Sequence, residues 1–349
     1  MAKTGDGSRA VLAVVWLAVG AAMVVVPAWL GWTRWQPILT GHPLVLALTI
    51  ACGLLGFVAL AWAVATLVLG DRADDEESGR ARTERERIRR ADRRVAFAVP
   101  TLFLCVLVVG ALVWSRPLAA TEPALAALRS GDGVRVADRL TWYELSPLRE
   151  DAKGRVIPPS TGLVFVPGAR VDPRAYAAVL RPLAAAGYFV AVLKEPFGVS
   201  LVDGRHAGRV MEVHPEIAQW VLGGHSLGGV TAASFADDHP QVAGAPVAGL
   251  VLFAAYPAGK LDRADLQVTS ISGELDGLTT PADIDEARDE LPPDTQYVVV
   301  PGAVHSSFGD YGEQEGDGTP TADRAEAQAA ITAATQDVLA AVTPKPKKK

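Results

Sequence analysis

The stretch from Trp220 to Gly229 reads WVLGGHSLGG, and it decides the fold that this sequence predicts. Its apolar first half is typical of a buried strand, and the run Val230 to Ala236 behind it favours a helix. Between the two, Gly224, Ser226 and Gly228 form the pattern G-x-S-x-G. A serine in a sharp strand-to-helix turn needs small neighbours, which glycine supplies. The pattern therefore predicts a nucleophile elbow that presents the Ser226 hydroxyl at the carboxyl end of a sheet.

A base and an acid that could serve this serine lie further along the chain. Serine is a weak nucleophile near neutral pH, so it needs a histidine to take its proton and an acid to orient the histidine. Asp276 follows the apolar strand Val268 to Ser272, and His305, the only histidine after it, follows the next strand. Because order and placement agree, we predict Ser226, Asp276 and His305 as a catalytic triad. Glu274 is the alternative acid, although it lies closer to its strand.

Two backbone N–H groups are candidates for binding the oxyanion that forms during acyl transfer. One belongs to Leu227, directly after the serine, and the other should come from the loop that follows an earlier strand. That loop is Pro167 to Arg170, so we predict Ala169 as the second donor, with Arg170 as the alternative. Each donor of this kind typically contributes about 10²–10³ to the rate.

Apolar strands and helices alternate from residue 141 to about residue 343. Such alternation predicts an α/β fold with a mostly parallel sheet covered by helices on both faces. The predicted strands are Thr141–Leu145, Gly162–Val166, Tyr188–Leu193, Ile217–Leu222, Val247–Ala255, Val268–Ser272 and Tyr297–Val300, and the predicted helices include Pro173–Ala185, Pro281–Glu290 and Ala322–Val342.

Together these motifs resemble the α/β-hydrolase family over roughly Thr141 to Val342. The elbow, the turn from Asp276 to Pro281 and the His305 loop carry the resemblance. The runs Pro167–Pro173 and His305–Gly312 are similar to a small bacterial subgroup related to dienelactone hydrolases. The resemblance implies an eight-stranded core and ester-type hydrolysis.

Two departures from the family's relatives bear on the substrate. Dienelactone hydrolases proper use a cysteine where this chain has Ser226, so their substrate does not carry over. Only about ten residues separate Ala258 from Val268, which leaves no room for the large lid of many lipases. The resemblance therefore implies an open site, shaped by the region from Glu195 to Glu216.

The first third of the chain carries three long apolar runs, Val11–Leu30, Leu44–Leu69 and Val95–Trp114, none of which contains a charged residue. About 20 residues are needed to cross roughly 30 Å of hydrocarbon as a helix. We therefore predict a membrane domain over residues 1–116. The first run could be a cleaved signal peptide, but its length and the two runs behind it favour an anchor.

The loop charges predict how these spans are oriented. The segment 71–94 contains nine arginines and eight acidic residues, whereas the loop between the first two spans has Arg34 as its only arginine or lysine. Positively charged loops stay in the cytoplasm. We expect a cytoplasmic N-terminus and Arg-rich loop, and an extracytoplasmic hydrolase domain at residues 141–343 after a linker at 117–140. Residues 344–349 are expected to form a basic tail.

The residue inventory argues against metal and cofactor chemistry. Cys52 and Cys105 both lie in predicted spans, so the exported part has no cysteine, and the chain has no H-E-x-x-H, P-loop or G-x-G-x-x-G motif. We expect no metal, no cofactor and no nucleic acid, since the Arg-rich loop is nearly neutral overall. The expected partners are the lipid bilayer and a small or lipid-like acyl substrate, while the oligomeric state is not indicated.

The sequence thus predicts a membrane-anchored serine hydrolase that cleaves a carboxylic ester or thioester. Two alternatives remain open. An acyltransferase would use the same triad with an acceptor other than water. A non-catalytic scaffold or binding protein of the cell envelope would keep the fold without the activity.

Overall fold

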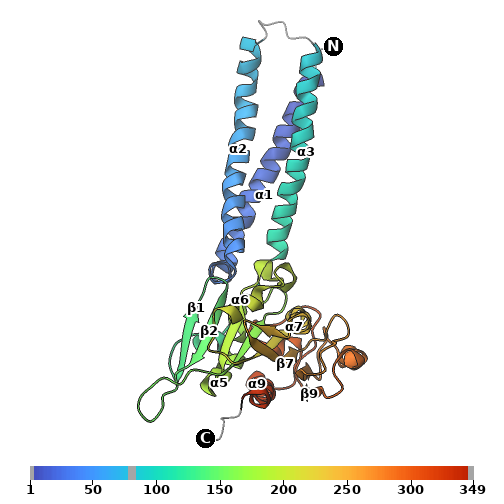
Figure 1. Ribbon diagram of the computed structural model, residues 1–349. Coiled ribbons are helices and arrows are strands. Elements are labelled where there is room, and N and C mark those ends of the chain that lie inside the picture. The colour runs from blue at the N-terminus through green and yellow to red at the C-terminus, as the bar shows by residue number, and fades with distance from the viewer. Residues whose placement is uncertain (1–3, 78–83, 345–349) are drawn as a thin grey trace. The chain divides into compact units, whose positions relative to one another are not determined.

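The computed structural model describes the backbone of residues 4–77 and 84–344 and, within these, the side chains of residues 11–68 and 96–344 (Figure 1). Residues 345–349 of the predicted basic tail and residues 78–83 of the predicted Arg-rich loop lie outside this range. The chain divides into two compact units, one formed by the first three helices and one that contains everything from Pro117 onwards.

The first unit consists of α1 (Thr4–Thr40), α2 (Pro43–Glu77) and α3 (Glu84–Trp114). Their segments Val11–Thr40, Pro43–Val68 and Ala96–Trp114 have mean hydropathies of 2.5, 2.6 and 2.6, and each is long and apolar enough to cross a membrane. The described parts of the predicted Arg-rich loop, residues 71–77 and 84–94, extend α2 and α3. The charged segment is therefore mostly helical.

The first helix is longer than predicted. It continues past Leu30 to Thr40, through the segment that was expected to be a loop. The helix is kinked at Arg34, whose φ of −140° and ψ of 27° are not helical. Pro37 has no N–H to donate to the carbonyl of Thr33, and the Arg34 guanidinium donates to that carbonyl instead at 3.3 Å. The side chain thus satisfies the carbonyl that the proline leaves open.

Small residues allow α1 and α2 to approach closely. A methyl group added to Gly56 would lie 2.8 Å from the Cβ of Met23 and 2.9 Å from the carbonyl oxygen of Gly20. Cys52 lies one turn before Gly56 on α2, and its Sγ lies 3.6 Å from the carbonyl oxygen of Met23 on α1. Close contact through glycine is the usual way in which helices pack inside a bilayer, where apolar burial gives no driving force.

The second unit is built on one twisted sheet. Its strands run in the order β1-β2-β4-β3-β5-β7-β8-β9, with a short β6 paired to β7. β1 and β2 are antiparallel to their neighbours, and the strands from β4 to β9 along this path are parallel. The strand bounds are β1 (Val134–Asp138), β2 (Trp142–Pro147), β3 (Thr161–Val166), β4 (Phe189–Leu193), β5 (Gln219–His225), β6 (Gln241–Val242), β7 (Ala245–Phe253), β8 (Gln267–Gly273) and β9 (Gln296–Val300). The predicted fold class, a mostly parallel sheet of the α/β-hydrolase type, is confirmed.

The sheet begins earlier than the sequence suggested. Val134–Asp138 lies within residues 117–140, which were assigned to a linker, yet it forms β1 at the edge of the sheet. Its five residues pair with β2, from Val134 opposite Pro147 to Asp138 opposite Tyr143. An antiparallel edge strand is not buried on both sides, so it lacks the continuous apolar run that marks the inner strands.

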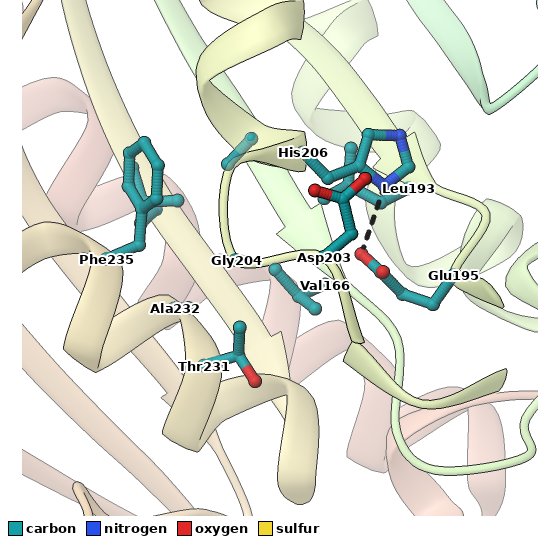
Figure 2. Close-up of a pocket in the computed structure, with 11 residues that line it drawn as sticks. Val166, Leu193, Glu195, Asp203, Gly204, His206, Thr231, Ala232 and Phe235 are labelled. Atoms are coloured by element: carbon teal, nitrogen blue, oxygen red, sulfur yellow. Dashed lines mark ion pairs between the residues drawn. The ribbon is translucent and has the colours of Figure 1, made fainter. Parts of the chain in front are cut away.

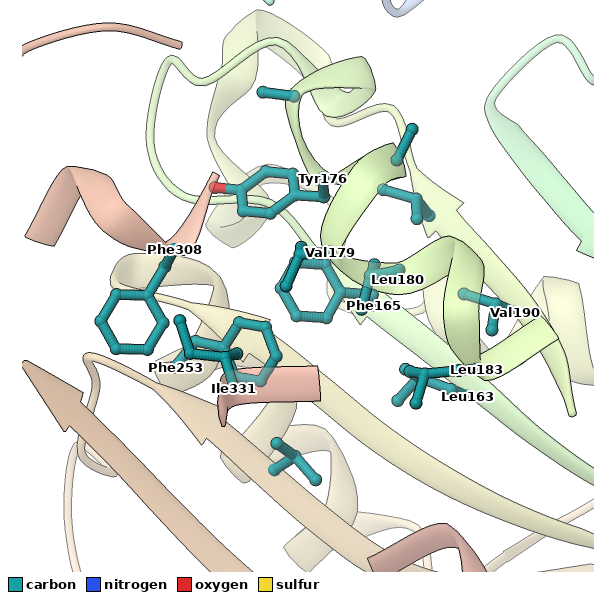
Figure 3. Close-up of a cluster of buried hydrophobic side chains, with 14 of the residues drawn as sticks. Leu163, Phe165, Tyr176, Val179, Leu180, Leu183, Val190, Phe253, Phe308 and Ile331 are labelled. Carbon is teal, nitrogen blue, oxygen red and sulfur yellow. The ribbon is translucent and has the colours of Figure 1, made fainter. Parts of the chain in front are cut away.

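Helices cover both faces of the sheet, because alternate strand residues point to opposite sides. Leu163 and Phe165 of β3 join one apolar cluster with α5 and α9, while Val164 and Val166 join another with α6 and α7. Figure 3 shows the first cluster, in which Phe165, Phe253 and Phe308 pack beneath Tyr176. The helices are α4 (Ala124–Ala127), α5 (Ala177–Ala185), α6 (His206–Glu212), α7 (Leu227–Asp238), α8 (Pro281–Glu286) and α9 (Arg324–Val342), with 3₁₀ turns η1 (Pro173–Tyr176), η2 (Pro196–Gly198), η3 (Ser200–Val202), η4 (Ala287–Glu290) and η5 (His305–Phe308).

Candidate active site

Ser226 lies between β5 and α7 in the sharp turn that its neighbours predict. Its φ of 53° and ψ of −126° are strained for a residue with a side chain. A methyl group on Gly224 would lie 2.3 Å from the carbonyl oxygen of Gly228, and one on Gly228 would lie 2.2 Å from the carbonyl oxygen of Val166. The turn therefore closes only with glycine at both positions, and it packs directly against the end of β3.

Asp276 and His305 come together although 29 positions separate them. Asp276 follows β8, His305 opens η5 after β9, and His305 Nδ1 lies 2.9 Å from Asp276 Oδ2, with both side chains at most 1% exposed. The other carboxylate oxygen, Oδ1, accepts the N–H groups of Leu278 and Thr279 at 2.8 and 2.7 Å. A carboxylate held in this way fixes the proton of His305 on Nδ1 and leaves Nε2 as an acceptor.

The alternative acid, Glu274, has a different partner. Its Oε2 accepts the N–H of Gly302 at 2.8 Å, in the loop between β9 and His305. Glu274 thus ties the two loops together, while Asp276 contacts the histidine ring.

A third carboxylate, which the sequence analysis did not identify, supports this pair. Asp317 accepts the N–H groups of His305 and Ser306 at 3.0 and 2.8 Å, and that of Gly277 at 3.4 Å. Burial alone would raise its pKa, but the backbone N–H groups outweigh burial and lower it. Asp317 therefore stays ionised and links the loop of Asp276 to the loop of His305.

Asp310, Tyr311 and Arg324 brace the histidine loop. The Tyr311 hydroxyl donates to the carbonyl of His305 at 3.4 Å. Asp310 is buried and accepts from Gln328 of α9 at 3.0 Å, and burial raises the pKa of its carboxyl. The Arg324 guanidinium, at the start of α9, donates to the carbonyls of Ser306 and Gly309. The loop is thus attached to α9 at several points.

The hydrogen bonds around the loop after β3 show which backbone N–H groups could bind an oxyanion. Gly168 donates its N–H to the Tyr176 hydroxyl at 2.9 Å, and Arg170 donates its N–H to the carbonyl of Gly198 at 2.8 Å. Among the residues that the structure describes, the N–H groups of Ala169 and Leu227 donate no hydrogen bond. Leu227 opens α7, where the first N–H groups of a helix have no partner inside the helix. Both groups are therefore available to an oxyanion.

A small pocket, shown in Figure 2, lies between α6 and α7. It is lined by Val166, Leu193, Leu222, Phe235 and neighbouring residues, and it contains neither Ser226 nor His305. At its edge Glu195 Oε1 lies 3.3 Å from His206 Nδ1, and burial raises the pKa of Glu195. Across the described residues, no group of three His, Cys, Asp or Glu side chains is placed to hold a metal ion.

Comparison with known proteins agrees with this architecture. Residues 162–329 match the sequence model of the alpha/beta hydrolase family. This domain has the alpha/beta hydrolase fold. The match covers Ser226, Asp276 and His305 but does not distinguish subgroups, so the likeness to dienelactone hydrolases stays a prediction.

Solved structures similar to the chain include two esterases. One is a thermostable esterase from Pseudomonas putida, which is 14% identical and covers 64% of this chain and 88% of that chain with a TM-score of 0.46. Another is a ferulic acid esterase from Streptomyces cinnamoneus, which is 15% identical. That match covers 59% of this chain and 86% of the esterase with a TM-score of 0.42. No curated protein matches the sequence.

Proposed function

We propose that this alpha/beta hydrolase is a membrane-anchored serine hydrolase that cleaves a carboxylic ester or thioester. The observation that carries the proposal is the buried pair of His305 and Asp276, joined at 2.9 Å, at the same sheet edge as the strained Ser226. The ring of His305 lies 4.5 Å from that of His225, the residue directly before the serine. Histidine, carboxylate and serine in this arrangement are the parts that acyl transfer through an acyl-enzyme requires.

The geometry supports the following mechanism. Ser226 Oγ attacks the acyl carbonyl while His305 Nε2 takes its proton, and Asp276 stabilises the resulting imidazolium. The N–H groups of Leu227 and Ala169 bind the oxyanion of the tetrahedral intermediate. His305 then protonates the leaving alcohol or thiol, which departs. Water, activated by the same histidine, attacks the acyl-enzyme and releases the acid.

Labelling with a fluorophosphonate probe tests the nucleophile. We expect the wild-type chain in detergent to be labelled and Ser226→Ala to be unlabelled. Ser234→Ala is a matched control, because Ser234 is an exposed serine on the same helix and contacts only the carbonyl of Val230. Folded wild-type protein that takes up no label would support the scaffold alternative and refute the enzyme.

The fate of the acyl group then separates hydrolysis from transfer. A panel of p-nitrophenyl esters and acyl thioesters of increasing chain length would give the preferred acyl group. Release of free acid at the rate of the leaving group is expected for a hydrolase. If transfer of the acyl group to an added alcohol exceeds hydrolysis even at a low alcohol concentration, the result would favour the acyltransferase instead.

We also propose that the hydrolase domain faces away from the cytoplasm. The support is the contrast between the nine arginines of residues 71–94 and the single Arg34 between the first two spans. A reporter that is active only outside the cytoplasm should be active when it is fused after Val342. The same reporter should be inactive when it is fused at Arg90, and the reverse pattern would overturn the orientation.

A further inference from the structure

We infer that Tyr176 is a positioning residue that aligns the oxyanion loop with the nucleophile elbow. The inference rests on the proposed function. The hydroxyl oxygen of Tyr176 lies 2.9 Å from the N–H nitrogen of Gly168, in the loop after β3, and 2.9 Å from Nδ1 of His225, the neighbour of Ser226. Tyr176 and His225 are completely buried. One hydroxyl therefore joins the two segments that must present Ala169 and Ser226 to the same substrate.

The hydrogen-bonding capacity of this hydroxyl fits both partners. A phenol has one proton to donate and lone pairs to accept with. The N–H of Gly168 can only donate, so the oxygen of Tyr176 accepts there. Its own proton then goes to Nδ1 of His225, which places the proton of that imidazole on Nε2. Burial raises the pKa of Tyr176, so the hydroxyl keeps its proton.

The ring of His225 extends this connection to the base. It lies 4.5 Å from the ring of His305 and is stacked on Phe308 at 5.7 Å with an angle of 18°. Burial, and next the nearby His305, lower the pKa of His225 well below its usual value. A neutral His225 adds no positive charge beside His305 when that ring becomes an imidazolium.

The surroundings of Tyr176 hold its hydroxyl in place. Figure 3 shows its ring over the apolar cluster, with the hydroxyl oxygen at the end of the ring that is remote from Val190 and Leu183. The ring packs on Phe165 at a centroid distance of 4.9 Å. A methyl group on Gly168 would lie 2.7 Å from His225 Nδ1, so the loop fits against the histidine only as glycine.

The consequence concerns the second oxyanion donor. The N–H of Ala169 belongs to the peptide that follows Gly168, so its direction depends on where Gly168 is fixed. An oxyanion donor contributes only when it points to the place where the charge develops. The Tyr176 hydroxyl should therefore contribute to transition-state binding while leaving ground-state binding of the substrate nearly unchanged.

The experiment compares Tyr176→Phe with Tyr143→Phe in the full-length chain. Tyr143 is a matched control, because it is also a buried tyrosine and its hydroxyl donates only to the carbonyl of Pro173 at 3.2 Å. With p-nitrophenyl acetate we expect Tyr176→Phe to lower kcat by about tenfold or more, with KM within about twofold. Its affinity for a trifluoromethyl ketone, which mimics the tetrahedral intermediate, should fall by the same factor as kcat/KM. Tyr143→Phe should change neither kcat nor that affinity.

Active-site titration with the fluorophosphonate keeps the test decisive if a variant folds poorly, because rates are then expressed per reactive Ser226. Gly168→Ala provides a second variant, which disturbs the same contact by adding an atom and should also lower kcat. Unchanged kcat and ketone affinity in titrated Tyr176→Phe would overturn the inference. Absence of Ser226-dependent turnover in the wild type would instead refute the proposed function.

Discussion

The two sides of the candidate active site are held together by different kinds of contact. On the acid–base side, carboxylates join the loops after β8 and β9. Glu274 and Asp317 do so by accepting backbone N–H groups, and Asp276 does so through the ring of His305. On the oxyanion side, the loop after β3 is joined to the elbow by direct contact of backbone with backbone, as at Gly228, and by the hydroxyl of Tyr176.

This difference predicts different responses to substitution. A carboxylate with several N–H partners can lose one partner and keep the others, so its loop should loosen by degrees. A backbone contact that leaves no room for a methyl group cannot adjust in this way, because adding the methyl group forces either the strand or the helix to move. Within the acid–base side, only Asp276 reaches a group that changes its charge during the reaction.

The largest effect is expected for Asp276→Asn. The amide would no longer stabilise the imidazolium of His305 or fix its proton on Nδ1, so kcat should fall by about 10³–10⁴-fold. Glu274→Gln is the control, because its remaining carbonyl oxygen can still accept the N–H of Gly302. We expect that variant to stay within about threefold of wild type, since a neutral hydrogen bond replaces a charged one away from the ring. Initial rates with p-nitrophenyl acetate measure both, and equal losses would mean that the acid was assigned wrongly.

The next largest effect is expected for Gly228→Ala. Its methyl group would meet the carbonyl oxygens of Val166 and Pro167 at 2.2 and 2.3 Å, and the movement would displace an oxyanion donor. We expect kcat/KM to fall by about 10²–10³-fold, and stability to fall by about 1–3 kcal/mol.

Gly208→Ala is the matched control for this steric argument. Gly208 is also a helical glycine, in α6, but its added methyl group would lie 3.5 Å from the ring of Phe235, an ordinary contact. That variant should keep its activity and be as stable as the wild type or more so, since alanine favours a helix. Urea unfolding and initial rates distinguish the two, and a fully active Gly228→Ala would show that the backbone contact is not needed.

The sequence predicted those parts of this arrangement that leave a local pattern. The inner strands were visible as continuous apolar runs, and Ser226, Asp276 and His305 were predicted as a triad because each follows such a run. The edge strand β1 was missed because Val134–Asp138 is short, is interrupted by the polar residue Arg135 and lies beside a glycine-rich turn. The kink at Arg34 was missed because a side chain replaces the missing donor of Pro37, which spacing does not reveal.

The supporting residues of the site left weaker signals. Tyr176 stands among Ala, Val and Leu at helical spacing and therefore reads as a core residue, although its hydroxyl has two polar partners. Asp317 lies 41 positions beyond Asp276, in a loop with no apolar pattern. The glycines on both sides of it were a usable signal, since a methyl group on Gly318 would run into the carbonyl oxygen of Leu275. Only the fold brings such distant loops together.

The smallest effect is expected for Asp317→Asn. His305 and Ser306 donate to different oxygens of Asp317, so the amide keeps an acceptor for only one of the two N–H groups. The loop should therefore loosen, and kcat should fall by only about tenfold. Asp323→Asn is the control, because Asp323 also accepts backbone N–H groups, those of Ala325 and Glu326, but at the start of α9. That control should lower the melting temperature and leave kcat unchanged.

The pH dependence of the melting temperature completes this last comparison. The folded pKa of Asp317 is lowered, so its ionised form stabilises the protein above the ordinary pKa of 3.8. This stabilisation is lost as the pH falls through the lower, folded value. The difference in melting temperature between wild type and Asp317→Asn should therefore be largest near pH 7 and should decrease below pH 3.8. A difference that is the same at every pH would show that Asp317 supports the loop by its shape and not by its charge.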